Sequence, residues 1–288
     1  VFDKTTKESG TLGKFNLTYK LDSEKLIYGT WSEGYRPGGV NRRGTLPPYL
    51  SDYLTNLELG WKTSWMDNRM TFNGAVFRQK WKDFQFAILG ANGLTEIKNA
   101  NQAQIDGLEV DLNWAATYNL AISGGFAIYD AKLTANYCGY VNVDGVPETN
   151  CATPEAPKGS RLPVTAEFKG NLTARYTFDW KGYEPFIQGS MVHEGKRTSD
   201  LRLEVRDILG DLPAYTVFDL SAGIRKNNWT LNFYVKNLFD QRAEFNRFTA
   251  CTEYICGASG YDPDYPNGQI YTIANQPRTM GLRFSQEF

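Results

Sequence analysis

The 288-residue sequence contains no long run of apolar residues, although 41% of its residues are hydrophobic. A transmembrane helix needs roughly 20 consecutive apolar residues, so a helical membrane span is excluded. An excess of one charge is also lacking, because 31 Lys and Arg residues nearly balance 32 Asp and Glu residues. The sequence has no basic stripe interleaved with aromatic residues, and nucleic acid is therefore not expected as a partner.

Histidine is scarce, and this limits the chemistry that the chain can perform. His193 is the only histidine, which excludes a multi-histidine metal site, gives Ser/His catalysis little support and weakens a haem-receptor interpretation. The acidic pair Glu109 and Asp111 leaves acid catalysis open in principle, although the polarity of one strand face explains this pair adequately. We expect no enzyme, no catalytic residue, no metal site and no cofactor.

Alternation of apolar and polar residues is the strongest pattern that is present. In residues 107–114 (GLEVDLNW) every second residue is apolar, and residues 57–62, 171–178 and 229–236 repeat this division. A strand of about 9 to 11 residues with one apolar face can cross a membrane without a continuous apolar run. Together with tryptophans near the strand ends and the terminal Phe288, the pattern predicts an all-β, antiparallel transmembrane β-barrel.

About eleven strands are predicted, and the connections between them alternate in length. Tight polar turns are expected at residues 22–25, 66–69, 116–119, 179–182 and 227–228, and most other connections are long and irregular. Outer-membrane barrels carry short periplasmic turns and long outward loops, so the turns and the carboxyl terminus are placed on the periplasmic side. The strands are expected at residues 13–21, 26–35, 53–64, 70–89, 94–115, 120–135, 164–178, 183–196, 214–225, 229–239 and 271–288.

One outward connection, residues 90–93, is short, but its flanking strands are about twice the membrane-spanning length. This hairpin is expected to project well beyond the bilayer.

The alternative fold is a soluble β-sandwich, whose strands are usually shorter and bury their apolar faces in one core. An odd strand number is unusual for a bacterial single-chain barrel, and residues 1–10 lack the zones of a signal peptide. The chain is therefore expected to be part of a longer precursor.

Several motifs resemble one family in their order and spacing. The motif NLFD at residues 237–240 is followed by a long loop and the closing segment 276–288 (QPRTMGLRFSQEF), which resembles the end of a TonB-dependent outer-membrane receptor. Residues 28–39 (YGTWSEGYRPGG) and 57–62 (LELGWK) resemble mid-barrel strands of that family. The resemblance covers essentially the whole chain, so residues 1–288 are identified as the carboxyl-terminal part of such a barrel.

This resemblance implies a barrel of about 22 strands filled by an amino-terminal plug domain, which is absent from this sequence. It implies active import across the outer membrane of a Gram-negative bacterium, in which a nutrient binds at the outer face and the TonB complex pulls on the plug. Expected partners also include outer-membrane lipid, lipopolysaccharide and the barrel assembly machinery, with Phe284 and Phe288 as the assembly signal.

Polar residues on the lumen face of the strands would line the plug or its surrounding water. Each of them is more simply interpreted as a hydrated wall residue without an individual role. The candidates are Glu58, Lys62, Glu109, Asp111, Arg175, Asp219, Arg225 and Arg283.

Ligand contacts are expected in the outward loops. Arginine and tyrosine in the loop 36–53 suit an anionic, aromatic chelate, because guanidinium groups pair with carboxylate or catecholate oxygens and stack on rings. The same residues could solvate the loop or bind lipopolysaccharide phosphates. The loop 241–270 carries aromatic residues that could grip a sugar or a chelate. The candidates are Arg36, Arg42, Arg43, Tyr49 and Tyr53 in the first loop, and Phe245, Arg247, Phe248, Tyr254, Tyr261 and Tyr265 in the second.

A ferric siderophore is the favoured nutrient. Import of an oligosaccharide or cobalamin remains an alternative within the family, and a passive porin or structural barrel is the alternative from another class.

The four cysteines form two local pairs, each within one predicted outward loop: Cys138 with Cys151, and Cys251 with Cys256. The export route is oxidising, and the spacings lack the paired C-x-x-C of structural zinc sites, so two loop disulfides are predicted. Closing a loop of about 15 residues contributes roughly 3 kcal/mol.

Overall fold

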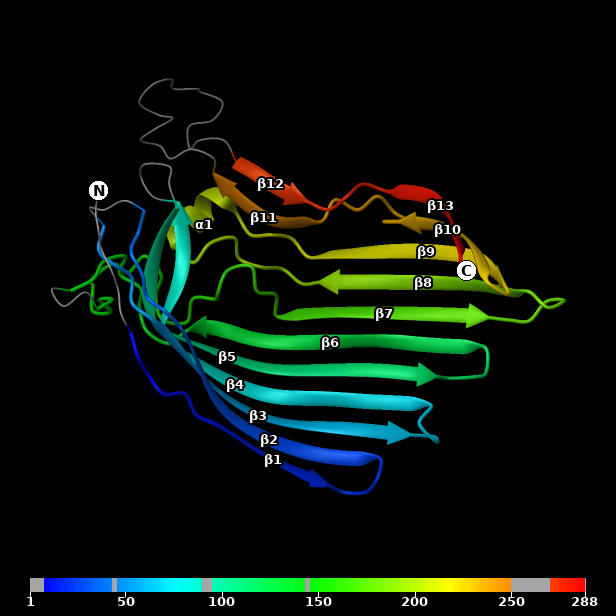
Figure 1. The fold of residues 1–288 in the computed structure, drawn as a ribbon. Helices are drawn as coiled ribbons and strands as arrows, with labels where there is room; N and C mark the ends of the chain where they lie inside the picture. The colour runs from blue at the N-terminus through cyan, green and yellow to red at the C-terminus, as the bar shows by residue number, and fades with distance from the viewer. Residues whose placement is uncertain (1–7, 43–45, 90–94, 143–145, 250–269, 288) are drawn as a thin grey trace.

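One large antiparallel sheet dominates the structure. The computed structural model describes residues 8–42, 46–89, 95–142, 146–249 and 270–287, and within them eleven strands form a sheet in the order β1-β2-β3-β4-β5-β6-β7-β8-β9-β10-β13. Figure 1 shows a curved sheet with long connections at one end, the loop end, and tight turns at the other, the turn end. The sheet is open, because β1 and β13 are not paired with each other in the described part of the chain.

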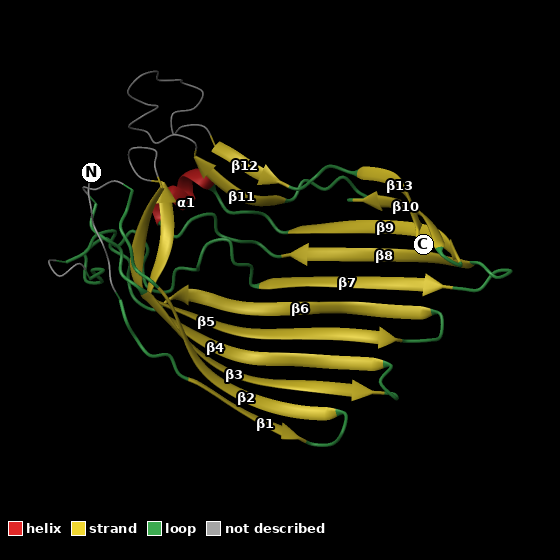
Figure 2. Ribbon diagram, viewed as in Figure 1, coloured by secondary structure: helices red, strands yellow, loops and turns green. Residues whose placement is uncertain are grey.

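The strands of this sheet are β1 (Lys14–Lys20), β2 (Lys25–Arg36), β3 (Asp52–Trp65), β4 (Met70–Leu89), β5 (Thr95–Ala115), β6 (Leu120–Leu133), β7 (Phe168–Thr177), β8 (Glu184–Glu194), β9 (Tyr215–Lys226), β10 (Trp229–Lys236) and β13 (Thr279–Gln286). A second sheet consists of β11 (Glu244–Thr249) and β12 (Ile270–Ala274). The helix α1 (Leu203–Leu209) contacts β11 at the loop end, as Figure 2 shows. In the described residues, no helix is long and apolar enough to cross a membrane.

The strands divide the sheet into an apolar outer face and a polar concave face. Leu57 and Leu59 on β3 are 61% and 58% exposed, whereas Glu58 between them lines a cavity on the concave face. Residues directly opposite each other in an antiparallel ladder lie on the same face. The pairing registers therefore show that the apolar face and the polar face continue across neighbouring strands. Further exposed apolar side chains of the outer face are Leu17, Val76, Ile128, Leu172, Leu231, Phe233 and Leu282. The predicted alternation is therefore present in the sheet.

The strands from β1 to β10 lie within or close to their predicted ranges, and β4 coincides with its range. The largest difference is at β7, which begins at Phe168 rather than at residue 164. Val164 has a φ of 57°, which a β-branched residue rarely adopts, and its N–H donates to the carbonyl of Thr198 at 2.8 Å. The predicted tight turns all lie at the turn end.

The β4–β5 ladder is long, as predicted from its sequence. It runs from Met70 opposite Trp114 to Leu89 opposite Thr95, while pairing between β3 and β4 stops at Lys82. Residues 83–89 of β4 and their partners on β5 therefore extend past β3 at the loop end, where Figure 1 shows them bending away from the rest of the sheet. The tip of this hairpin, residues 90–94, lies outside the described residues.

The single strand predicted at residues 271–288 is wrong, because the segment forms β12 and β13 in two different sheets. The chain between them contains Pro277, which has no backbone N–H to donate to a ladder. Asn275 anchors this break, since its N–H donates to the carbonyl of Ala243 and its side chain to that of Gln241, both at 3.0 Å. The loop 241–270 is correspondingly not wholly irregular, because it contains β11.

A small apolar core lies at the loop end. Ring contacts link Trp81, Phe84 and Phe86 on β4 to Tyr137 in the connection after β6. Leu201, from the connection between β8 and β9, packs into the same cluster. The long connections are thus folded over the projecting strands and are tied to them by burial of apolar surface.

Candidate functional site

Polar side chains from several strands line one wide cavity on the concave face. Its volume is about 970 Å³, and it is lined by residues of β2 to β8. The predicted lumen residues Glu58, Lys62, Glu109 and Asp111 all lie along it. They come together because residues of one face follow each other across the ladders: Asn73, for example, lies opposite both Lys62 and Asp111.

These acidic side chains are held by neighbours on the same face. Glu58 accepts a hydrogen bond from the Tyr28 hydroxyl at 2.7 Å, and Asp111 accepts one from the Asn73 amide at 3.0 Å. The Tyr129 hydroxyl donates to Glu109. The wall is therefore a hydrogen-bonded polar surface, and Glu109 and Asp111 are each engaged by a different partner.

The predicted arginines lie farther along the concave face. The Arg175 guanidinium lies 3.7 Å from the centre of the Phe186 ring, and Arg225 donates to Glu184 at 2.5 Å. Arg283 lines a second cavity of about 220 Å³, together with Asp219. The charged lining of the first cavity thus consists of acidic residues together with Lys62 and Lys169, whereas the predicted arginines lie on β7, β9 and β13.

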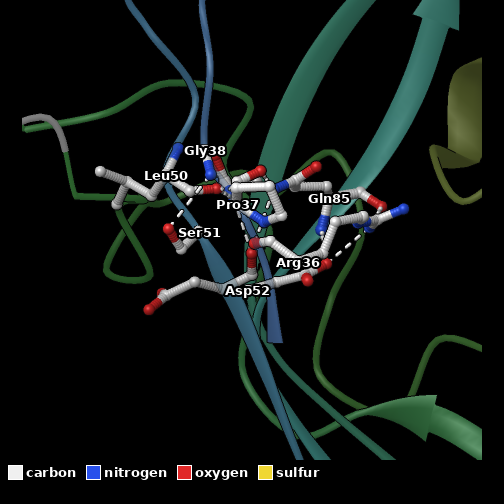
Figure 3. A network of polar contacts seen from close by, with 9 residues as sticks. Arg36, Pro37, Gly38, Leu50, Ser51, Asp52 and Gln85 are labelled. Atoms are coloured by element: carbon white, nitrogen blue, oxygen red, sulfur yellow. Dashed lines mark hydrogen bonds and ion pairs between the residues drawn. The ribbon is translucent and has the colours of Figure 1, made fainter. Parts of the chain in front are cut away.

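A buried polar network at the loop end fixes the connection between β2 and β3 (Figure 3). The Asp52 carboxylate accepts hydrogen bonds from the Arg36 guanidinium at 2.5 Å and from the backbone N–H of Gln85 at 2.9 Å. The Gln85 amide in turn donates to the carbonyls of Pro37 and Leu50, both at 2.9 Å. Asp52 is 2% exposed and Gln85 is 8% exposed. The β2–β3 connection is therefore held against the projecting hairpin.

Two asparagines extend this network. The Asn99 side chain accepts from the N–H of Leu50 at 2.8 Å and donates to its carbonyl at 2.9 Å, which reproduces the bonding of a strand neighbour. Asn41 makes the same pair of bonds with the backbone of Ile97, at 3.0 Å and 2.8 Å. Loop and hairpin thus form one unit, which we call the β2–β3 lock: Arg36, Asn41, Asp52, Gln85 and Asn99.

A smaller cavity of about 280 Å³ lies beside this lock. Its lining includes Tyr49, Lys98, Tyr137 and Tyr140. The Tyr137 hydroxyl is buried and has no hydrogen-bond partner among the described residues, and burial raises the pKa of this phenol above its usual value. The lining also includes the buried Glu96 beside Lys98. Aromatic rings with one cationic and one acidic side chain can accommodate a small ring-containing group.

The connection after β6 carries a disulfide between Cys138 and Cys151, as predicted, with Cα atoms 6.1 Å apart. Lys98 on β5 donates to the carbonyl of Gly139 at 3.1 Å. The disulfide therefore constrains a segment that lines the 280 Å³ cavity. The second predicted pair, Cys251 and Cys256, lies outside the described residues.

The helix α1 is clamped to β11 by Arg247. Its guanidinium donates to Glu244 at 2.8 Å and to the carbonyl of Leu209 at 2.9 Å. Beside it, Asp211 accepts from Arg206 at 2.8 Å and from Lys196 at 2.9 Å, and these cations, Arg206 above all, lower the pKa of Asp211 to about 2. This end of the molecule is held by ion pairs in connections outside the large sheet.

The predicted ligand residues fall into three groups. Arg36 and Arg247 serve as anchors of the loop end, although Arg36 also leaves half of its side chain exposed. Arg42 is exposed, Tyr49 is half-buried at the 280 Å³ cavity, and Phe245 is 40% exposed beside Tyr215. Phe248 is 44% exposed, and Tyr53 lies on the outer face opposite Lys82. Arg43, Tyr254, Tyr261 and Tyr265 lie outside the described residues.

Sequence reasoning missed the residues that hold the loops. Asp52, Gln85 and Asn99 read as ordinary polar positions near strand ends, and only their burial under the connection reveals their role. Tyr137 was missed for the same reason. Polar residues in the part of the long β4–β5 hairpin that extends past β3 are the only signal that the sequence offers.

Residues 2–238 match the family described as TonB dependent receptor-like, beta-barrel. The metal-pseudopaline receptor CntO of Pseudomonas aeruginosa is 26% identical over 232 residues, which cover 80% of this chain and 29% of that protein. This family is one of transport receptors, and its members are outer-membrane β-barrels of Gram-negative bacteria.

Solved structures agree in fold. The ferric yersiniabactin uptake receptor FyuA from Yersinia pestis has a TM-score of 0.70 at 19% identity, over 96% of this chain and 37% of that one. The siderophore receptor PiuA from Acinetobacter baumannii has a TM-score of 0.67 at 19% identity, over 94% of this chain and 35% of that one. The chain thus spans about a third of the length of the proteins that it matches. On this match and this fold, the chain belongs to the TonB-dependent receptor family and corresponds to its β-barrel part.

Proposed function

We propose that the chain supplies the carboxyl-terminal eleven strands of a barrel of about 22 strands in the outer membrane, within a receptor that imports a ferric siderophore. The observation that carries the proposal is the division of one sheet into an exposed apolar face and a polar concave face. An apolar outer band and a polar lumen are what a membrane-spanning barrel requires. The plug domain and the remaining strands would come from other parts of the receptor.

In this placement the loop end faces the medium and the turn end faces the periplasm. The concave wall, with Glu58, Lys62, Glu109 and Asp111, would surround the plug. TonB would act on the plug and open a path along this wall. The outer face would contact membrane lipid, and Phe284, which is 63% exposed there, would serve with Phe288 in recognition by the barrel assembly machinery.

The ferric chelate is favoured by the names of related proteins and by the chemistry of the loop end. One relative is a metal-pseudopaline receptor and another a probable siderophore receptor. At the loop end, Tyr49 and Lys98 line the 280 Å³ cavity. Arg42, seven residues before Tyr49 in the sequence, is exposed. Aromatic rings with cations suit an anionic chelate with aryl groups. We propose Arg42 and Tyr49 as ligand contacts, whereas Arg36 is held in its ion pair with the buried Asp52.

Two measurements test the proposal. The abundance of the complete receptor in outer membranes should rise strongly when cells grow with an iron chelator. Uptake of a radiolabelled ferric siderophore should require both the receptor and TonB, because a passive pore needs no energy from the inner membrane. Uptake that persists without TonB would favour a porin, and unchanged abundance under chelation would overturn the iron assignment.

Import of an oligosaccharide or cobalamin is the second candidate. It is favoured by Phe245 and Phe248, two aromatic side chains that β11 leaves 40% and 44% exposed at the loop end. Rings of this kind stack on sugars as readily as on a chelate. Growth on a sugar as sole carbon source, lost on deletion of the receptor gene, would distinguish this function from iron uptake.

A further inference from the structure

The 280 Å³ cavity at the loop end contains a buried carboxylate without a partner. Glu96 lines this cavity and is 7% exposed. Within the described part of the chain, its side chain makes no hydrogen bond and no ion pair. A buried charge is costly when it stands alone, and buried carboxylates in proteins are therefore paired with a cation or held by hydrogen bonds. Glu96 thus lacks the cation that its burial requires.

Lys98 lies close by but does not supply this cation. It is two positions from Glu96 on β5, so the two side chains share a face and their Cα atoms lie about 6.6 Å apart. This face turns towards the connection after β6, because Phe86, opposite Lys98, meets the Tyr137 ring. The Lys98 ammonium donates there to the carbonyl of Gly139 at 3.1 Å. Lys98 is therefore held by the loop, and the Glu96 carboxylate stays unpaired.

Tyrosine rings line the same cavity. Tyr49 comes from the connection between β2 and β3, and Tyr137 and Tyr140 come from the connection after β6. A carboxylate among aromatic rings suits an ammonium group, because the faces of the rings attract a cation as the carboxylate does. With Glu96 and Lys98 as its charged residues, the lining has no net charge. A purely anionic group therefore gains little from this cavity.

The cavity is small, and its walls are fixed. Sites for small molecules typically occupy about 300 to 1,000 Å³, so 280 Å³ accommodates one arm of a ligand better than a whole ferric chelate. The β2–β3 lock holds one wall through the paired bonds between Asn99 and Leu50. The disulfide between Cys138 and Cys151 constrains the other. A site with preformed walls lowers the entropy cost of binding.

We infer that this cavity is a subsite for a protonated amine carried beside a ring, with Glu96 as its counter-ion. The inference rests on the proposed function, because the amine is taken to belong to the imported nutrient. It narrows that nutrient to a chelate with a cationic arm. Arg42, which directly follows the lining residue Asn41, would meet the anionic metal-binding part, and Glu96 the amine. A neutral sugar would leave the charge of Glu96 unpaired.

The test uses the complete receptor purified in detergent and two probes of equal size, protonated 2-phenylethylamine and neutral 2-phenylethanol. Probes of about nine non-hydrogen atoms should bind with a Kd of roughly 10 mM without the ion pair. A hydrogen bond to a charged group strengthens binding by about tenfold or more. Titrations followed by ligand-observed NMR should therefore give a Kd of about 1 mM or lower for the amine with the wild type.

Three variants isolate the charge of Glu96. Glu96→Gln should bind the amine and the alcohol equally, with its affinity for the alcohol unchanged, which shows that the cavity is intact. Glu96→Asp keeps a carboxylate and should keep a preference for the amine. Glu204→Gln is the matched control, because it removes an exposed acidic side chain of α1 at the same end of the molecule, and its preference should match wild type. Equal binding of both probes by the wild type would overturn the inference, as would an unchanged preference in Glu96→Gln.

Uptake by cells links the subsite to the nutrient. The concentration of ferric siderophore that half-saturates TonB-dependent uptake should rise about tenfold in Glu96→Gln, because the same charged hydrogen bond is lost. The maximal rate should not change, and Glu204→Gln should behave as wild type. Half-saturation that is the same in Glu96→Gln and wild type would overturn the assignment of the amine to the nutrient. If the wild type takes up no ferric siderophore, the proposed function fails, and the two probes alone decide whether the cavity binds an amine.

Discussion

Replacing Asp52 by alanine should release the β2–β3 connection from the projecting hairpin. The change removes the acceptor of the buried Gln85 N–H, whose bond is 2.9 Å long, and leaving a buried donor unpaired costs about 1 to 3 kcal/mol. It also removes the ion pair with Arg36, whose side chain is 50% exposed, and such a pair is worth about 1 kcal/mol. The β2–β3 lock should therefore lose about 2 to 4 kcal/mol of local stability.

Hydrogen exchange measured by mass spectrometry reads this loss directly. Protection of the Gln85 amide should fall by a factor of roughly 30 to 900, which corresponds to about 2 to 4 kcal/mol, and peptides from residues 37–51 should exchange faster with it. Strands β7 to β10 should be unaffected, because β6 separates them in the sheet from the strands that carry the lock. Far-UV circular dichroism of the variant should match wild type.

Two matched variants separate charge from hydrogen bonding. Asp52→Asn keeps an oxygen that can accept from Gln85, so only the ion pair is lost and protection should fall by about tenfold or less. Arg36→Ala leaves the Asp52 carboxylate buried without its cation, which costs about 3 kcal/mol or more. The double variant should lose less than the sum of the single losses. Wild-type protection in Asp52→Ala would refute the assignment of the lock.

Three further perturbations test other parts of the structure. Replacing both cysteines of the 138–151 disulfide by serine should remove up to roughly 3 kcal/mol of constraint and make that loop the first site of limited proteolysis; equal cleavage rates would contradict a structural role. The pKa of Asp211 is lowered to about 2, so its stabilisation is complete above pH of about 4 and lost as the pH falls towards 2. Protection of α1 should follow that step, and Asp211→Asn should abolish it. Gly107→Ala places a methyl group 2.3 Å from the Phe77 ring and should cost about 1 to 3 kcal/mol in thermal stability, whereas Gly189→Ala, with no atom within 4 Å, should be neutral.

The large sheet was predictable because one physical pattern repeats along it. Each strand must present apolar residues to one face and polar residues to the other, and this requirement is written into every second residue, as in residues 107–114. Turn residues end the strands independently, so most strand ends lie close to prediction. The predictions missed elements where neither the alternation nor a turn residue marks them in the sequence. The seven residues of α1 have no side-chain N-cap, and β11 is a six-residue strand whose partner lies after residues 250–269.

The break after β12 could have been predicted from Pro277, because proline cannot donate to a ladder and is confined to strand edges and starts. The β2–β3 lock could not. Asp52 and Gln85 are 33 residues apart in sequence, and their burial depends on the path of the connection between β2 and β3. The alternation of polar and apolar residues places each residue on a strand, but it does not predict that the β2–β3 connection folds back over the hairpin.

The partners that each arginine has in the structure also decide which arginines of the loop end can bind a ligand. Residue type alone makes Arg36, Arg42 and Arg247 equal candidates for an anionic chelate. In the structure, Arg36 is neutralised by the buried Asp52 and Arg247 by Glu244, so an approaching anion meets ion pairs of no net charge and would have to break charge-assisted bonds to use them. Arg42 is exposed, and its charge is available without that cost. Arg42→Gln should therefore weaken ferric siderophore binding by the complete receptor and leave exchange of the Gln85 amide unchanged. Arg36→Lys should leave siderophore binding unchanged and speed exchange of the Gln85 amide. Equal effects of both changes on binding would show that the ligand also contacts the β2–β3 lock.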